Sequence, residues 1–532
     1  MIYDARKPMR RLTRAVQRAA WRALTRADAG LNRLYGWRYN PLYHSGALVV
    51  ALFAVLLVTG IYLLFVYRLG APYQSVAALT AQPWLGRWIR GLHRYASDAA
   101  VIAVAVHGLR MFTQGRSWGP RTLAWITGLI LCFVTLICGW TGLVMVWDGP
   151  AQVLAQEGAR LFDVLPVFAE PISRAFVGER PIPSAFFFLN LFVHIALPIG
   201  LGLLVWLHVS RVARPGLLPP RGLLWGTIVL LTLLGVVWPA PLGPPANLFR
   251  VPGQAPYDVF YTFWLPLSRA LPAGVVWALI VAGSVLLLLV PWLVRPAPVH
   301  RPAPSSVNES LCTGCEQCYL DCPYEAIAMI ARPGGASEGR SALIAHVDPA
   351  LCVSCGICSG SCAPMGVGPP GRTGRDQLSA VRAFVAATHP GPRDVVVIAC
   401  DRGAGGVAGG LAVPGVHVWP VTCAGNLHTS VVEFLIRGGA GGVVVASCPP
   451  RDCSNREGPK WLEQRLYHER EAELQERVDR RRVLLVHAGL YERELVVSAL
   501  EQLQAIIASL ERAKGEAEFD LVRECEMDTV GS

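Results

Sequence analysis

Four histidines in the apolar first half of the chain form two pairs with one spacing. His93 and His107 are 14 residues apart, and so are His194 and His208. An α-helix rises 1.5 Å per residue and 14 residues make nearly four turns, so the members of a pair share one face about 21 Å apart. A single histidine on an apolar helix would more often be a hydrogen-bonded packing residue. Two matched pairs instead predict two bis-histidine haem b sites, with His93 and His194 as the outer ligands and His107 and His208 as the inner ones.

Glycines repeat the same interval. Gly46 and Gly60 are 14 residues apart, as are Gly128 and Gly142. Close approach of membrane helices is one explanation, because small residues are common at such contacts. The interval shared with the histidines favours another. A haem plane needs neighbouring helices that carry no side chain at its own depth, and glycine supplies that gap.

Cysteines of the second half form two runs with the spacing C-x2-C-x2-C-x3-C. These runs resemble those of a bacterial two-cluster ferredoxin, in which the fourth cysteine of each run binds the other cluster. The resemblance implies two [4Fe–4S] clusters. Zinc could also bind four such thiolates and is the alternative. The first cluster would be held by Cys312, Cys315, Cys318 and Cys362, and the second by Cys352, Cys355, Cys358 and Cys322.

The last part of the chain alternates short apolar runs with helical patterns, which predicts an α/β domain with a parallel sheet. Strands are expected at 394–399, 416–422, 442–447 and 482–487, and helices at 427–436 and 461–478. Three strands lead into cysteine, and a fourth cysteine follows soon after. Ligands of such sheets gather at the carboxyl ends of the strands, so one further cluster is expected there. Its candidate ligands are Cys400, Cys423, Cys448 and Cys453.

The segment from Cys448 to Cys453, together with this strand order, resembles the delta subunit of methyl-viologen-reducing hydrogenases. The resemblance implies a [2Fe–2S] cluster and docking to flavoproteins of the heterodisulfide-reductase type. The family's cysteine-rich first loop is reduced here to Cys400. Buried structural cysteines are the alternative reading.

The histidines lie in or near long apolar runs that are expected to form membrane-spanning helices. The 532-residue chain is 53% hydrophobic and 16% charged, and nearly all of the hydrophobic excess lies before about residue 295. Runs of about 20 apolar residues are long enough to cross a bilayer. One weaker run carries Arg90, Arg94 and Asp98, which should face the bundle interior or the interface. Six spans are expected, at residues 46–67, 88–109, 122–147, 181–210, 222–240 and 270–294.

The connecting segments predict an orientation. The net charge is +11, but the basic residues form no continuous stripe, so nucleic acid is not an expected partner. Basic segments fall on one side and most acids on the other, which places both termini and the cysteine-rich domains in the cytoplasm. We expect a multi-pass protein of a bacterial or archaeal inner membrane. Residues 1–43 are expected to be a basic cytoplasmic segment rather than a cleaved signal peptide.

Residues 40–294 resemble cytochrome b of the bc-type quinol-oxidising complexes. The four histidines, the glycine pairs, the Trp147-Asp148-Gly149 exit of the third span and the segment from His194 to Pro198 carry this resemblance. It implies a quinone site near the outer haem and allows a homodimer through this domain.

In the family, part of that quinone site is a Pro-Glu-Trp-Tyr segment before the last span. This chain has Pro256-Tyr257-Asp258 there, so the glutamate is missing. A quinone carries protons with its electrons, which makes Asp258 the candidate acid. A solvated loop acid is the alternative.

The predicted fold is an all-α transmembrane di-haem bundle followed by a small α+β ferredoxin domain and an α/β parallel-sheet domain. The expected parts are residues 1–43, 44–294, a linker at 295–310, 311–370, 390–520 and a tail at 521–532.

The predicted function is that of an electron-transfer subunit. It would pass electrons between cytoplasmic flavin or iron–sulfur oxidoreductase subunits and the quinone pool. Since no motif resembles a flavin, molybdenum or nickel site, the substrate-oxidising chemistry is expected in a partner. Two alternatives stay open: an anchoring conduit without its own quinone site, and a redox-responsive membrane scaffold.

Overall fold

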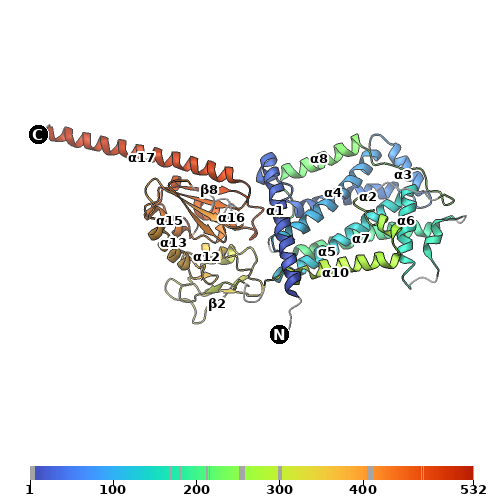
Figure 1. Cartoon of the computed structure of the whole chain (residues 1–532), viewed down its shortest axis with the longest axis horizontal. Coiled ribbons are helices and arrows are strands. Elements are labelled where there is room, and N and C mark those ends of the chain that lie inside the picture. Colours follow the sequence, from blue (N-terminus) through green and yellow to red (C-terminus); the bar gives the residue numbers. More distant parts are fainter. Residues whose placement is uncertain are drawn as a thin grey trace. The chain divides into compact units, whose positions relative to one another are not determined.

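The computed structural model describes residues 6–166, 170–178, 181–210, 214, 216–250, 258–296, 302–403, 411, 413–468, 470 and 472–530, with backbone alone at 6–10 and 514–530. The chain divides into two compact units (Figure 1). The first contains Met1–Arg18 and His44–Arg295, and the second contains Ala19–Tyr43 and Pro296–Ser532.

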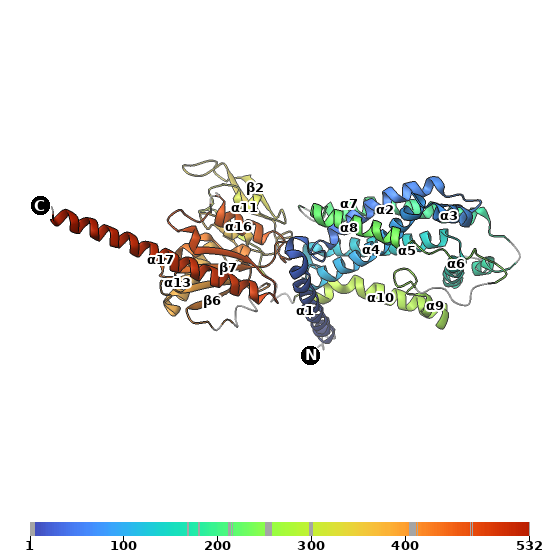
Figure 2. The same cartoon turned by 90° about the horizontal axis from the view of Figure 1, so that it is seen from above.

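Long helices build the first unit (Figures 1 and 2). They are α2 (Ser45–Val66), α4 (Gly86–Thr113), α5 (Thr122–Met145), α7 (Ser184–Ser210), α8 (Arg221–Val237) and α10 (Ala273–Val294). Helix α4 packs against α2 and α8, and α5 packs against α7 and α10. Large apolar side chains point away from the bundle, as Phe65 and Ile199 do with 86% and 71% of their surface exposed. Such an outward apolar surface is expected of helices that face lipid.

Four of the described helices are long and apolar enough to cross a membrane: α2, the segment Gly119–Met145 that includes α5, α7 and α10. Helix α8 has 17 residues, and α4 carries the charges of Arg90, Arg94 and Asp98. Six crossings therefore remain a prediction, while a multi-pass helical bundle is confirmed.

Shorter helices complete this unit: α3 (Pro72–Ala81), α6 (Gly149–Phe162) and α9 (Leu265–Ala270), with α1 (Arg6–Tyr39) divided between the two units. Helix α6 begins at Asp148, whose carboxylate accepts hydrogen bonds from the backbone N–H groups of Ala151 at 3.0 Å and Gly243 at 2.9 Å. An N-cap aspartate followed by proline is a strong helix start. The Trp147-Asp148-Gly149 exit is therefore a turn into α6.

The ferredoxin-like part of the second unit consists of two small antiparallel pairs and two short helices. Strand β1 (Ser306–Val307) pairs with β4 (Val367–Gly368), and β2 (Ile327–Ala331) pairs with β3 (Leu343–Val347). Helices α11 (Gln317–Leu320) and α12 (Ile357–Gly360) carry the third cysteine of each run. Strand β1 lies inside the stretch that we expected to be a linker. Its pairing with β4 joins these two residues to the ferredoxin-like part, and the bounds of the linker stay a prediction.

A four-stranded parallel sheet forms the core of the last part, as predicted. Its order is β6-β5-β7-β8, with β5 (Val395–Cys400), β6 (Val416–Val421), β7 (Gly442–Ser447) and β8 (Val483–His487). Neighbouring residues of a strand point to opposite faces of the sheet. Val396 and Ile398 accordingly pack toward α13 (Gly374–Thr388), α15 (Thr429–Arg437) and α16 (Gly458–Tyr467). Val395 and Val397 pack against α17 (Arg493–Val530).

One predicted helix is shorter than expected. The pattern at 461–478 predicts a single helix, but α16 ends at Tyr467, and His468 is already extended. The backbone N–H of Leu474 bonds to the carbonyl of Arg465 at 3.0 Å, so the chain turns back along the helix. This turn buries Leu474 completely in the core, which periodicity alone does not reveal.

Candidate haem and iron–sulfur sites

The predicted outer histidines face each other across the bundle. The ring centroids of His93 on α4 and His194 on α7 are 6.5 Å apart. Metal–imidazole bonds measure about 2 Å, so this separation suits two rings on opposite sides of one metal. The inner histidines, His107 and His208, also lie close enough to interact electrostatically. The structure thus pairs the four histidines at two depths, in the combination that the sequence predicts.

Threonine hydroxyls fix the orientation of three of these imidazoles. The Oγ1 atoms of Thr59, Thr127 and Thr141 lie 2.8, 2.9 and 3.0 Å from the Nδ1 atoms of His93, His208 and His194, in that order. Each hydroxyl donates its own proton to a carbonyl of its helix. Each therefore accepts from the Nδ1–H group, which leaves the Nε2 lone pair free for a metal.

Sequence reasoning missed these threonines, although the signal is present. Each one directly precedes a glycine of the 14-residue series, and Ser45 occupies the equivalent place before Gly46. A hydroxyl residue followed by glycine, repeated at the histidine interval on two helices, is the pattern that identifies them.

The glycines lie directly against the histidine rings. A Cβ atom at Gly46 would come within 2.8 Å of His107, and one at Gly142 within 2.9 Å of His194. At Gly60 and Gly128 the corresponding distances to His93 and His208 are both 3.3 Å. A side chain at these positions would push the imidazole off its axis. The donor set, the tautomer and the space left by glycine all fit a haem between each histidine pair.

Asp258, the predicted quinone-site acid, belongs to a polar cluster at the end of the bundle that carries His93. Its carboxylate pairs with Arg94, which follows His93, and Arg94 also pairs with Asp98. The other Asp258 oxygen accepts the backbone N–H groups of Phe260 and Tyr261 at 2.7 and 3.1 Å. Only 18% of the Asp258 side chain is exposed, so it differs from a solvated loop acid. Pro256 and Tyr257 lie outside the described residues.

Tyr261 connects this cluster to two helices. Its hydroxyl donates to the Ser97 carbonyl at 3.0 Å, and its ring occupies the place where Gly139 lacks a side chain. Arg94 was expected to face the bundle interior or the interface, but its contact with Asp258 and that of Tyr261 with Ser97 each join residues 164 positions apart, so neither contact could be read from local patterns.

The eight ferredoxin-like cysteines gather in two groups that cross between the runs. Cys318 has Cys362, Cys315 and Cys312 as electrostatic neighbours, and Cys358 also acts on it. Cys355 has Cys358, Cys322 and Cys352. Burial first, and then these neighbouring thiols, raise the pKa of Cys355 well above its usual range. Packed thiols of this kind are unfavourable until a metal replaces their protons, so the donor sets fit iron–sulfur clusters.

Hydrogen bonds to sulfur support the same groups. The backbone N–H groups of Ser305, Ala326 and Gly366 donate to the Sγ atoms of Cys352, Cys322 and Cys362 at 3.3, 3.3 and 3.2 Å. Such bonds stabilise thiolate ligands and tune the potential of a cluster. Ser305 is part of the stretch expected to be a linker, so this residue was missed.

The four cysteines of the last domain meet at the carboxyl ends of the parallel strands. All four are buried, with 1–4% of their surface exposed. The Sγ atoms of Cys400 and Cys448 are 3.5 Å apart, and this contact lowers the pKa of Cys400 to about 7. Cys453 forms hydrogen bonds with Cys423 and Cys448, which raise the pKa of both. Four thiols in mutual contact fit a compact cluster such as [2Fe–2S].

Gly458 makes room for this group. A Cβ atom there would lie 3.2 Å from the Cys453 sulfur and 3.5 Å from the Cys423 sulfur, and 3.4 Å from the Cα atom of Gly425. The sequence analysis did not select Gly458, because it lies next to these cysteines only in the folded chain.

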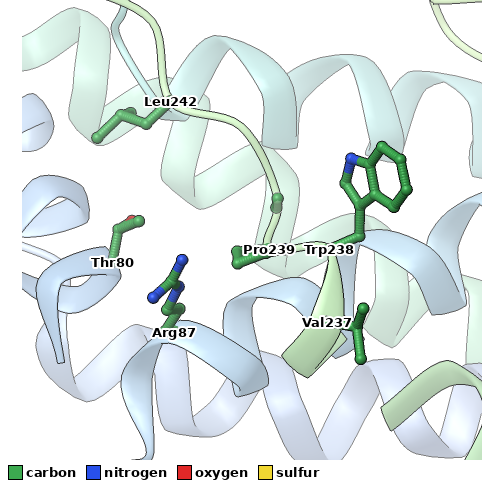
Figure 3. A pocket seen from close by; sticks show the side chains of 7 residues that line it. Thr80, Arg87, Val237, Trp238, Pro239 and Leu242 are labelled. Carbon is green, nitrogen blue, oxygen red and sulfur yellow. The ribbon is translucent and has the colours of Figure 1, made fainter. Parts of the chain in front are cut away.

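Among the described residues, no three His, Cys, Asp or Glu side chains converge tightly enough to hold a single metal ion. An open pocket of about 740 Å³ occurs in the first unit between α3, α4 and the end of α8 (Figure 3). Arg87, Thr80 and Trp238 are among the residues that line it. None of the predicted site residues lines it, so it carries no assignment.

Three family models match separate parts of the chain. Residues 35–216 match cytochrome b/b6/petB, residues 306–328 match the 4Fe-4S binding domain, and residues 395–511 match the delta subunit of methyl-viologen-reducing hydrogenase. These are the three resemblances predicted from the motifs.

Curated relatives match the first part. The menaquinol:cytochrome c reductase cytochrome b subunits of Bacillus subtilis (strain 168) and Geobacillus thermodenitrificans are each 26% identical over 195 residues, which is 34% of this chain and 86% of theirs. A solved structure, the hyperthermophilic respiratory Complex III, has a TM-score of 0.39 at 17% identity and covers 47% of this chain and 75% of its own. Along its length the chain is thus similar to cytochrome b, then to a 4Fe-4S binding domain, and then to the delta subunit of methyl-viologen-reducing hydrogenase.

Proposed function

We propose that the chain is the membrane electron-transfer subunit of a quinone-linked oxidoreductase. Its outer part reacts with a quinone, and its cytoplasmic domains exchange electrons with flavin or iron–sulfur subunits of a partner. When bound, two b haems, two [4Fe–4S] clusters and one [2Fe–2S] cluster supply the one-electron carriers that this role requires. The chain itself supplies ligands, spacing and orientation.

One observation carries this proposal. The histidines pair at two depths of an apolar bundle, and in three of them a threonine hydroxyl accepts the Nδ1 hydrogen and leaves Nε2 available for a metal. Two haem sites about 21 Å apart along the helices span most of a bilayer's hydrocarbon core of about 30 Å. The buried cysteine groups of the second unit provide matching sites outside the bundle.

The cytochrome b relatives support a quinone as the electron acceptor or donor in the membrane, because their names specify menaquinol. We extend that chemistry to this chain and assign the quinone to the outer end, near Asp258 and the His93–His194 pair. The positive-inside rule supports placing both termini and the second unit in the cytoplasm. The match to the hydrogenase delta subunit supports a flavoprotein partner there.

Stopped-flow spectroscopy of the purified full chain tests the quinone assignment. The haems are first reduced chemically, and their re-oxidation is followed after mixing with a soluble naphthoquinone. We expect a rate that rises with quinone concentration, and at least a tenfold lower rate in Asp258→Asn. A wild-type rate that is unchanged by added quinone contradicts the assignment.

A second candidate function is an electron conduit that has no quinone site of its own. The pairing of Asp258 with Arg94 favours it, because that carboxylate already has a partner. The same measurement separates the two functions: quinone-independent re-oxidation, with both haems present, supports the conduit.

A further inference from the structure

A buried polar network joins the ferredoxin-like part of the second unit to the α/β part. Its centre is Arg465 on α16, which is completely buried. One guanidinium nitrogen donates to the Ser361 hydroxyl at 2.9 Å, and another donates to the Gly425 carbonyl at 2.8 Å. Ser361 lies three residues after Cys358, a ligand of the second ferredoxin-like group, and directly before Cys362, a ligand of the first, and Gly425 follows Cys423 by two residues. One side chain therefore bonds to ligand segments of two different candidate clusters.

The network continues to a second ligand segment of the ferredoxin-like part. The Ser361 hydroxyl donates to the Asp321 carboxylate at 2.6 Å, and Asp321 directly precedes Cys322. Asp321 is completely buried and pairs with Arg470 at 2.5 Å. Two guanidinium groups and one carboxylate leave the network with one net positive charge.

Independent contacts show which ferredoxin-like group faces the α/β part. Trp461 of α16 packs with Cys355 and Ile357. The Asn426 amide donates to the Gly356 carbonyl at 2.8 Å. Both contacts involve the second cysteine run. The group of Cys352, Cys355, Cys358 and Cys322 is therefore the one adjacent to the distal four-cysteine site.

Within the described part of the chain, no carboxylate forms a direct ion pair with Arg465. Its hydrogen bonds go to neutral oxygens, and its Nε atom has no hydrogen-bond partner among the described residues. A buried charge without compensation is costly. Burial lowers the pKa of Arg465 to about 10, while Asp321 and the thiols of Cys423 and Cys358 oppose this lowering. The guanidinium is therefore placed where negative charge from both cysteine groups would compensate it.

We propose that Arg465 is a positioning residue shared by two iron–sulfur sites, which holds their ligand segments together and raises the reduction potentials of both. The inference rests on the proposed function, because it needs clusters at both cysteine groups. Reduction adds negative charge to a thiolate-bound cluster, and a fixed positive charge in a low-dielectric interior stabilises that reduced state.

Redox titration of the purified full chain, followed by electron paramagnetic resonance, tests this inference at pH 8. Arg465→Gln removes the charge. At a fixed applied potential, we expect the ratio of reduced to oxidised form to fall about tenfold at both sites, which is about 59 mV for a one-electron centre. Arg465→Lys keeps the charge and should restore most of the shift. Arg481→Gln is the matched control, because Arg481 pairs with Asp479 at the surface and should shift neither site.

Asp321→Asn supplies a test of opposite sign. It removes the carboxylate that the described residues contribute to the network, so the net positive charge increases and the potential of the adjacent [4Fe–4S] site should rise. A purely structural role would not move potentials in opposite directions in Arg465→Gln and Asp321→Asn. If the Arg465→Gln variant fails to retain iron, the Asp321→Asn variant alone tests the inference. A potential of the adjacent [4Fe–4S] site that is unchanged or lower in Asp321→Asn overturns it.

The cluster inventory separates this inference from the proposed function. Iron and acid-labile sulfide are measured on the wild-type chain first. A wild-type chain without the distal cluster contradicts the proposed function. A chain with all clusters present, in which Arg465→Gln shifts neither potential, overturns the role of Arg465 alone.

Discussion

The two units of this chain position their ligands in different ways. In the helical bundle, each candidate ligand is set by its place along a long helix, with a glycine on the facing helix and, at three of the four histidines, a hydroxyl beside it. In the second unit, the ligands lie on short loops and strand ends, and contacts between distant segments bring them together. The helical sites leave no room for a side chain at the facing glycine. The loops of the second unit are instead held in place by buried polar hydrogen bonds.

The largest effect is expected when a methyl group is added at a glycine that faces a histidine in the bundle. Gly142→Ala would place a Cβ atom 2.9 Å from His194, and the packed interior gives it no room. We expect loss of the outer haem, so that the haem content falls from two per chain toward one in a pyridine haemochrome assay. Gly200→Ala on α7 is the control, because its Cβ atom would have no neighbour within 4 Å. Equal haem content in both variants would contradict the glycine account.

A smaller effect is expected when the hydroxyl is removed and the volume is kept. Thr59→Val deletes the acceptor of the His93 Nδ1–H group. The imidazole then donates less electron density to its metal, so the potential of the outer haem should rise while both haems are retained. We expect up to about a tenfold change in the reduced-to-oxidised ratio at fixed potential, about 59 mV. The readout is optical redox titration. A shift confined to the inner haem would show that the pairing of threonine with histidine is misassigned.

The smallest effect concerns the stability of the parallel sheet. Asp394, just before β5, accepts a backbone N–H from Gly391 and a hydrogen bond from His417, and these bonds lower its pKa. A carboxyl with a lowered folded-state pKa stabilises the fold above its unfolded value near 3.9, and this stabilisation is lost as the pH falls through the folded pKa.

Thermal unfolding of wild type and Asp394→Asn between pH 7 and pH 3 measures this contribution. We expect a slightly lower melting temperature for the variant at pH 7, and a difference that shrinks below about pH 4. A difference that is constant over the whole pH range would exclude the carboxylate as its cause.

More of the candidate site could be predicted from the sequence in the helical bundle than in the second unit. Helix periodicity is a local property, so the spacing of His93 and His107 alone predicts that they share one face of a helix. The parallel strands of the α/β part could likewise be predicted from short apolar runs. The hydroxyl residues before the glycines also recur at the 14-residue interval, so the threonines beside the histidines could have been predicted from the sequence as well.

Other features depend on the folded chain. Arg465 and Ser361 are 104 residues apart, and nothing in either segment predicts their bond. Helix α16 ends at Tyr467 because the following turn buries Leu474 in the core. The position of Ser305 is determined by its hydrogen bonds to the sulfur atoms of Cys352 and Cys358. Tertiary contacts decide such positions, and local patterns do not contain them.

We propose that electrons pass between the cysteine sites of the second unit and the haems of the first. The most direct test is stopped-flow haem reduction by a reduced soluble flavoprotein in wild type, in Cys448→Ser, and in Cys132→Ser as a control within α5. The account predicts that Cys448→Ser keeps both haems but loses haem reduction by at least tenfold, while Cys132→Ser behaves as wild type. Haem reduction at the wild-type rate in Cys448→Ser would contradict it.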